Sequence, residues 1–212
     1  MLSDLYKETQ QIHLETLGPK HPSYATTLCN LAVFYQSMGA YEKAEPLYKE
    51  TAQIQLEVLG PKHPEYAVAL GNFAGLYESM GAYEKAEPLY KETQQIQFAT
   101  LGPKHPQYAI TLGNFSGLYI HMGANSKALE LLQEAWDITR SFLSSSMAVL
   151  PTRDRLSSVR SVEGFLQGYV SMASALRSQG RLSQEDSAAM FRGSGVLGAK
   201  ARPCVDTKRR CR

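Results

Sequence analysis

The sequence predicts an all-α fold built from repeated pairs of antiparallel helices. Three observations carry this prediction. The pentapeptide Gly-Pro-Lys-His-Pro occurs three times at intervals of 42 residues, beginning at Gly18, Gly60 and Gly102. Residues 38–64 and 80–106 agree at 23 of 27 positions. Apolar residues recur at helical spacing between the pentapeptides, and a period of 20 to 50 residues is typical of stacked helical units.

Each unit contains two predicted helices. The first spans residues 24–38, and its apolar face is formed by Leu28, Leu31, Ala32 and Tyr35. It ends at Gly39, because glycine accepts the left-handed conformation of a helix C-terminus. A longer second helix follows and ends at Gly60. The same pattern predicts seven stacked helices over residues 1–143, because only stacking buries the apolar face that each pair leaves open.

The pentapeptide is predicted to be a turn between units. Its glycine closes the long helix, the first proline prevents continuation, and the second proline begins the next helix. The histidine is expected to support this turn. Zinc needs nitrogens about 2.0–2.1 Å from one centre, whereas equivalent points on stacked helices lie about 8–10 Å apart. His21, His63 and His105 therefore cannot share a zinc ion, and we expect no metal and no cofactor.

The charge distribution divides the chain near residue 140. Residues 1–140 carry a formal charge of −5 and residues 141–212 a charge of +7. We expect a linker at residues 144–154, a helical segment at 155–198 and a disordered basic tail at 199–212. The tail could attract phosphate, but it has no aromatic stacking partner and no recognition fold, so nucleic-acid binding is not expected.

The remaining composition favours a cytoplasmic protein that does not act on membranes. Neither a signal-peptide core nor a stretch of about 20 apolar residues is present. The cysteines Cys29, Cys204 and Cys211 show no disulfide framework spacing, which favours a reducing compartment. No nucleotide-binding glycine loop or nucleophile elbow is found, so we expect no enzymatic activity. Cys29 is interpreted as a structural or groove thiol.

The pattern of each unit resembles the tetratricopeptide repeat, in the 42-residue variety of kinesin light chains. The residues that carry the resemblance are Leu28, Leu31, Ala32, Tyr35, Gly39, Tyr41, Ala44 and Tyr48, with their counterparts one period later. The resemblance covers residues 1–143 and implies a right-handed superhelical array, or solenoid, whose concave groove binds a protein or peptide segment. Residues 155–200 loosely resemble the segment preceding CHAT peptidase domains, so the alternative is a truncated regulatory region of such a caspase-like peptidase.

The resemblance also implies where the groove lies. The first helix of each pair lines it, which puts Asn30, Asn72 and Asn114 in a ladder that hydrogen-bonds a peptide backbone, as the matching asparagines of kinesin light chains do. The other predicted groove residues are Val33, Gly71, Gly75, Glu78, Gly113, Gly117 and His121. The four glycines serve either close helix packing or the approach of a ligand. The lining contains Glu78 and no Lys or Arg, so we expect a neutral, apolar or mildly basic ligand. Self-association stays open.

Overall fold

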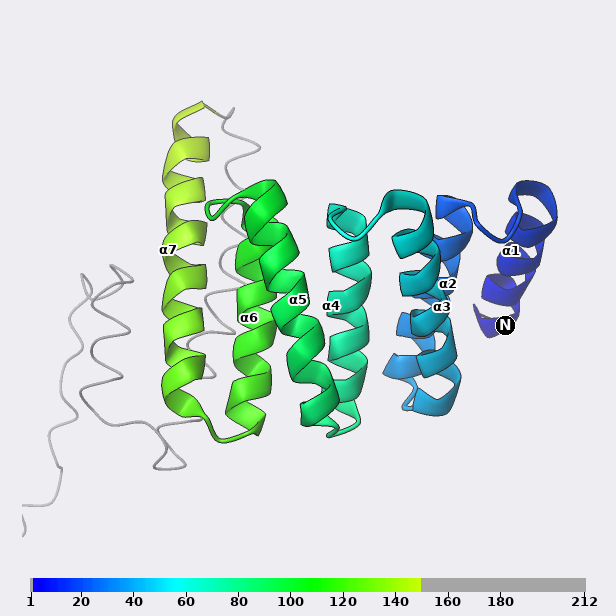
Figure 1. The fold of residues 1–212 in the computed structure, drawn as a ribbon, viewed down its shortest axis with the longest axis horizontal. Helices are drawn as coiled ribbons and strands as arrows, with labels where there is room; N and C mark the ends of the chain where they lie inside the picture. The colour runs from blue at the N-terminus through cyan, green and yellow to red at the C-terminus, as the bar shows by residue number, and fades with distance from the viewer. Residues whose placement is uncertain (1, 150–212) are drawn as a thin grey trace, which may run out of the picture. The chain divides into compact units, whose positions relative to one another are not determined.

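The structure, a computed structural model, describes residues 2–149, which all belong to one unit of the chain, residues 1–159. These residues form seven helices, which follow one another in chain order (Figure 1). The helices are α1 (Leu2–Leu17), α2 (Pro22–Ser37), α3 (Tyr41–Leu59), α4 (Pro64–Ser79), α5 (Tyr83–Leu101), α6 (Pro106–His121) and α7 (Asn125–Val149). The prediction of an all-α array of antiparallel helices is confirmed.

The helices stack as repeated pairs. We call α2, α4 and α6 the first helices of the units, and α3, α5 and α7 the second helices. Each helix contacts the next in the chain, and the first helices also contact one another directly, α2 with α4 and α4 with α6. Side chains of three successive first helices therefore lie on one continuous face, whereas α1 corresponds to the second helix of a unit.

The turns between units have the predicted chemistry. Each first helix begins at the second proline of the pentapeptide, and the preceding histidine is its N-cap in an extended conformation. The Nδ1 atom of His63 accepts a hydrogen bond from the backbone N–H of Glu65 at 3.2 Å. His21 and His105 accept equivalent bonds at 3.1 Å. The three histidines each satisfy an otherwise unpaired N–H at the start of their own helix.

The first helices end at glycines with a left-handed backbone conformation. Gly39 has a φ of 70°, in the left-handed region. The N–H of Gly39 donates to the carbonyl of Gln36, and that of Ala40 donates to the carbonyl of Tyr35, each at 2.9 Å. These two bonds form a Schellman motif, which pairs carbonyls that a helix end would leave free.

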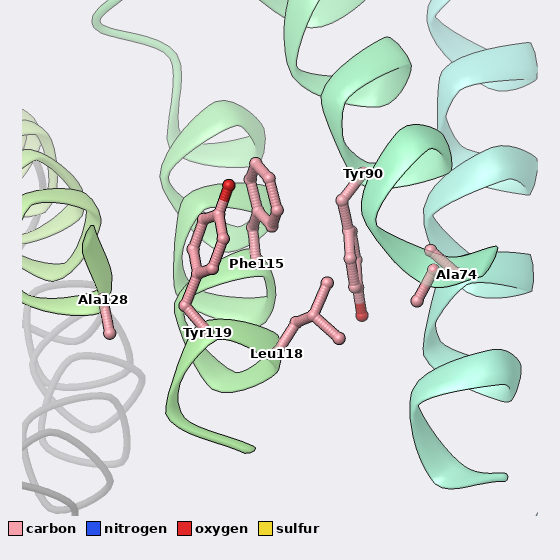
Figure 2. Packing of buried hydrophobic residues seen from close by; sticks show 7 residues of the cluster. Ala74, Tyr90, Phe115, Leu118, Tyr119 and Ala128 are labelled. Atoms are coloured by element: carbon pink, nitrogen blue, oxygen red, sulfur yellow. The ribbon is translucent and has the colours of Figure 1, made fainter. Parts of the chain in front are cut away.

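Aromatic side chains fill the space between successive units. In the cluster drawn in Figure 2, Tyr90 of α5 faces Phe115 and Leu118 of α6. The rings of Tyr90 and Phe115 stack with centroids 5.5 Å apart, and those of Phe115 and Tyr119 with centroids 4.7 Å apart. Such burial removes large apolar surfaces from water and fixes the stacking of one unit on the next.

Helix α7 extends beyond the end that we predicted for the array. We predicted that it ends at residue 143 and that a linker begins at 144, but α7 continues to Val149. The serines in this stretch are tolerated inside a helix, and the first proline, Pro151, comes only after it. The rest of the predicted linker, the segment at 155–198 and the tail at 199–212 lie outside the described residues.

Candidate functional site

A pocket of about 300 Å³ lies on the face formed by the first helices. We call it the groove pocket. It is lined by Val33, Gln36 and Ser37 of α2, Tyr48 of α3, Gly71, Asn72 and Gly75 of α4, Tyr90 of α5 and Asn114 of α6. Three units therefore contribute to one site.

The groove pocket brings together half of the residues that the sequence predicted. Val33, Gly71, Asn72, Gly75 and Asn114 line it. The predicted residues that are not part of its lining are Asn30, Glu78, Gly113, Gly117 and His121.

A neutral hydrogen-bond network, here called the first bridge, joins α3, α2 and α4 beside the pocket. The hydroxyl of Tyr48 donates to Oε1 of Gln36 at 2.8 Å. Nε2 of Gln36 lies 2.9 Å from Oγ of Ser79 and 3.2 Å from the carbonyl oxygen of Gly75. The first bridge therefore ties one first helix both to its own second helix and to the next first helix.

An ionisable network, here called the second bridge, repeats this arrangement one unit later. The hydroxyl of Tyr90 donates to Oε2 of Glu78 at 2.9 Å, and Oε1 of Glu78 lies 3.2 Å from Nδ1 of His121. Burial raises the pKa of the Glu78 carboxyl, and the contacts with Tyr90 and His121 oppose that rise. The side chain of Glu78 is only 16% exposed, so its charge is largely turned inward.

The two tyrosines of the pocket act as hydrogen-bond donors. Burial raises the pKa of the Tyr48 hydroxyl and that of the Tyr90 hydroxyl far above the ordinary value, and the nearby Glu78 carboxylate raises that of Tyr90 further. Both hydroxyls therefore stay protonated, and the pocket gains no negative charge from them.

The three asparagines of the predicted ladder differ in the hydrogen bonds that their side chains form. Asn72 donates from Nδ2 to Sγ of Cys29 at 3.3 Å, which leaves its carbonyl oxygen free to accept. Burial raises the pKa of the Cys29 thiol, in accordance with a structural role for this cysteine. Asn30 and Asn114 are exposed, and within residues 2–149 their side chains form no hydrogen bond. Two of the three amides are thus available to a ligand.

Three of the four predicted groove glycines, Gly71, Gly75 and Gly117, differ in the space around them. A Cβ atom on Gly71 would lie 3.4 Å from Thr93, and one on Gly75 would lie 3.6 Å from the Tyr90 hydroxyl, which are ordinary contacts. A Cβ atom on Gly117 would lie only 3.2 Å from Oε1 of Glu78, which is tight. Gly117 therefore makes room for the second bridge, whereas packing alone does not require the glycines at 71 and 75.

Sequence reasoning missed the contribution of the second helices. Tyr48 and Tyr90 line the pocket although both belong to second helices, and we had assigned the groove to first helices alone. The sequences of the repeats contain a pattern that points to these two tyrosines. The pair Tyr48 and Gln36 becomes Tyr90 and Glu78 in the next unit, and it becomes Leu132 and Ile120 in the unit after that. When the tyrosine is replaced, its polar partner is replaced with it.

The site holds no charged side chain in its lining. Among residues 2–149 no cluster of three or more His, Cys, Asp or Glu side chains could hold a metal ion. None of the helices in the same range is long and apolar enough to cross a membrane. The groove pocket is therefore uncharged, with both polar and apolar residues in its lining.

A stacked array of helix pairs with a groove along its first helices defines a helical-repeat protein. The particular family is the tetratricopeptide repeat, to which this chain belongs, because the family's model matches residues 3–50, 25–97 and 78–141. Proteins built from this repeat generally mediate protein interactions. A search among curated proteins gives no similar relative.

Solved structures show the same fold. The crystal structure of BtubC (BKLC) from P. vanneervenii is 17% identical, with a TM-score of 0.66 over 99% of this chain and 78% of that chain. A kinesin light chain type protein from Podosopora anserina, with nearly identical TPR-like repeats, is 22% identical, with a TM-score of 0.59 over 95% of this chain and 87% of that one. A variant of the Podosopora anserina protein is 21% identical, with a TM-score of 0.59 over 92% of this chain and 84% of that one.

Proposed function

We propose that this chain is a non-catalytic scaffold that binds a protein partner by holding an extended segment of it in the groove pocket. The observation that carries the proposal is the pocket itself, which draws on three consecutive first helices and contains Asn72 and Asn114. An extended segment lying across the first helices would contact equivalent residues of each unit in turn.

The asparagines are proposed to hold the backbone of the bound segment. A side-chain amide supplies both donors and an acceptor, so it can pair with a peptide carbonyl and N–H whatever the side chain of the peptide is. Asn114 has both groups free and Asn72 has its carbonyl oxygen free. Asn30, exposed on α2, would extend the same ladder towards the N-terminal unit.

The partner segment is proposed to be neutral, apolar or mildly basic. The pocket contains no Lys or Arg that could balance an acidic ligand. Glu78 lies beside the site, but its carboxylate already contacts Tyr90 and His121. A strongly acidic segment would have to give up its hydration without gaining a counter-charge.

The test replaces Asn72 and Asn114 by alanine and measures both stability and capture of a phage-displayed library of random 12-residue peptides. Removing backbone hydrogen bonds worth about 1 kcal/mol each should weaken binding of the captured peptides about tenfold or more. The melting temperature should change little. Gln53→Ala is the matched control, because this exposed amide does not line the pocket and donates a hydrogen bond to Glu57 on its own helix. Lost stability with unchanged capture would show that the asparagines are structural.

Two further parts of the hypothesis stay predictions. A cytoplasmic location is expected from the composition of the chain. The alternative, a regulatory region of a CHAT-type peptidase, depends on residues 155–200, which lie outside the described part of the structure.

A further inference from the structure

We infer that the groove pocket selects its ligand by one uncharged, apolar side chain of about the size of leucine or methionine. Gly71 and Gly75 would provide the space for this anchor side chain. The inference rests on the proposed peptide-binding function and names the class of side chain that the site recognises.

The shape of the pocket supports an inserted side chain. The nearest atoms to a Cβ atom on Gly71 or Gly75 would be 3.4 Å and 3.6 Å away, so alanine would fit at both positions. In the preceding unit the same positions are occupied by Cys29 and Val33, which shows that the repeat accepts larger residues there. Glycine destabilises a helix interior relative to alanine. The space that two glycines leave is therefore not a requirement of folding.

The charge of the pocket supports an uncharged anchor. The hydroxyls of Tyr48 and Tyr90 already donate hydrogen bonds to Gln36 and Glu78. The amide nitrogen of Gln36 donates in turn to Ser79 and to the carbonyl of Gly75. A charged side chain that entered would lose its water and meet no opposite charge in the lining, which is strongly unfavourable.

The walls and the volume support an apolar anchor of limited size. Val33 is 47% exposed and lines the pocket beside Tyr48 and Tyr90, which are almost completely buried. Covering the exposed apolar surface of Val33 with another apolar group is favourable. A volume of about 300 Å³ is at the small end of ligand sites, so it suits one side chain and its adjoining backbone.

The experiment starts from peptides captured from the random 12-residue library. Synthetic versions of one captured peptide carry Ala, Val, Leu, Met, Phe, Lys or Glu at each position in turn, and their affinities are measured by fluorescence anisotropy. We expect one position where Leu or Met binds at least tenfold more tightly than Ala, Lys or Glu.

Variants of the array identify the pocket as the place where the anchor binds. Gly75→Ala should raise the melting temperature and weaken binding of the Leu peptide at least fivefold, and Gly75→Val should weaken it more. Val33→Ala, which enlarges the pocket, should shift the preference towards Phe. Ala99→Val, on an exposed part of α5 that does not line the pocket, is the control and should leave affinity unchanged.

The outcomes separate the two proposals. If peptides are captured and depend on Asn72 and Asn114, but every position tolerates Lys as well as Leu, the peptide-binding function stands and the anchor is wrong. The anchor is also wrong if Gly75→Ala lowers the melting temperature and leaves affinity unchanged, because the glycine would then be structural. If no peptide is captured, the proposed function fails and the anchor fails with it.

Discussion

The first and second bridges occupy the same place in successive units and use different chemistry. In the first, Tyr48, Gln36 and Ser79 are joined by neutral hydrogen bonds. In the second, the equivalent residues are Tyr90, Glu78 and His121, and two of them can carry charge. The position must connect each first helix to its own second helix and to the next unit, but the repeat does not prescribe a charge for it.

Burying the carboxylate of the second bridge costs free energy, and the surrounding residues reduce that cost. A half-buried carboxylate is less favourable than an amide in the same place, because it gives up more hydration. Tyr90 and His121 compensate Glu78 on both oxygens, and Gly117 leaves the space that the carboxylate needs. In the last unit the tyrosine and its polar partner are replaced by Leu132 and Ile120, so the connection there has no polar pair.

The largest expected effect comes from converting the second bridge into the apolar type of the last unit. Glu78→Ile alone leaves the buried Tyr90 hydroxyl without a partner, and Tyr90→Leu alone removes the donor to Glu78. Each single change should cost about 2–4 kcal/mol of unfolding free energy, because it removes a hydrogen bond to or from a charged group and also changes the packing of a buried side chain. The double variant should lose less than the sum, with a coupling of about 1–2 kcal/mol, in a urea unfolding cycle followed by circular dichroism. Strict additivity would show that the two positions are independent.

A smaller difference in unfolding free energy is expected between two variants that each remove the tyrosine hydroxyl of one bridge. Tyr48→Phe removes a hydrogen bond to an amide and should cost about 0.5–1.5 kcal/mol, whereas Tyr90→Phe removes one to a carboxylate and should cost about 1.5–3 kcal/mol. Both rings stay in place, so packing is matched between the variants. Equal losses in urea unfolding would mean that Glu78 is no more dependent on its phenol than Gln36 is.

Local chemistry explains what the sequence could predict. The helix starts at Pro22, Pro64 and Pro106, the histidine caps and the glycine ends depend on residues a few positions apart, so each could be inferred from the pattern. The order of stacking followed from the period, because each pair leaves an apolar face that only a neighbour can cover.

The parts that could not be predicted depend on distances between helices. Gly75 and Gly117 occupy equivalent positions in successive units. Only the structure shows that the Glu78 carboxylate lies against Gly117. Only the structure shows that Tyr48 and Tyr90 of the second helices line the groove pocket. The exposed Asn30 belongs to the same sequence ladder as Asn72 and Asn114, yet it falls outside the pocket, because the pocket is centred on the middle unit.

The smallest predicted effect concerns pH, and it follows from the raised pKa of the Glu78 carboxyl. A folded-state pKa above the ordinary value of 4.5 means that the folded array holds this proton more tightly than the unfolded chain does. The resulting stability is fully present below the unfolded value and is lost as the pH rises through the folded value. Glu78 therefore contributes less to the stability of the array at neutral pH than below pH 4.5.

The double substitution Glu78→Gln with His121→Ser should remove this dependence, because it turns the second bridge into a copy of the first. Relative to the parent chain, the variant should gain unfolding free energy as the pH rises from about 4 to 7, since only the parent must hold a half-buried carboxylate there. Urea unfolding of both proteins at several pH values measures the difference, and His121→Ser alone separates the carboxylate from its partner. A constant difference across this range would show that the compensation by Tyr90 and His121 cancels the effect of burial, and the charged bridge would then be equivalent to the neutral one.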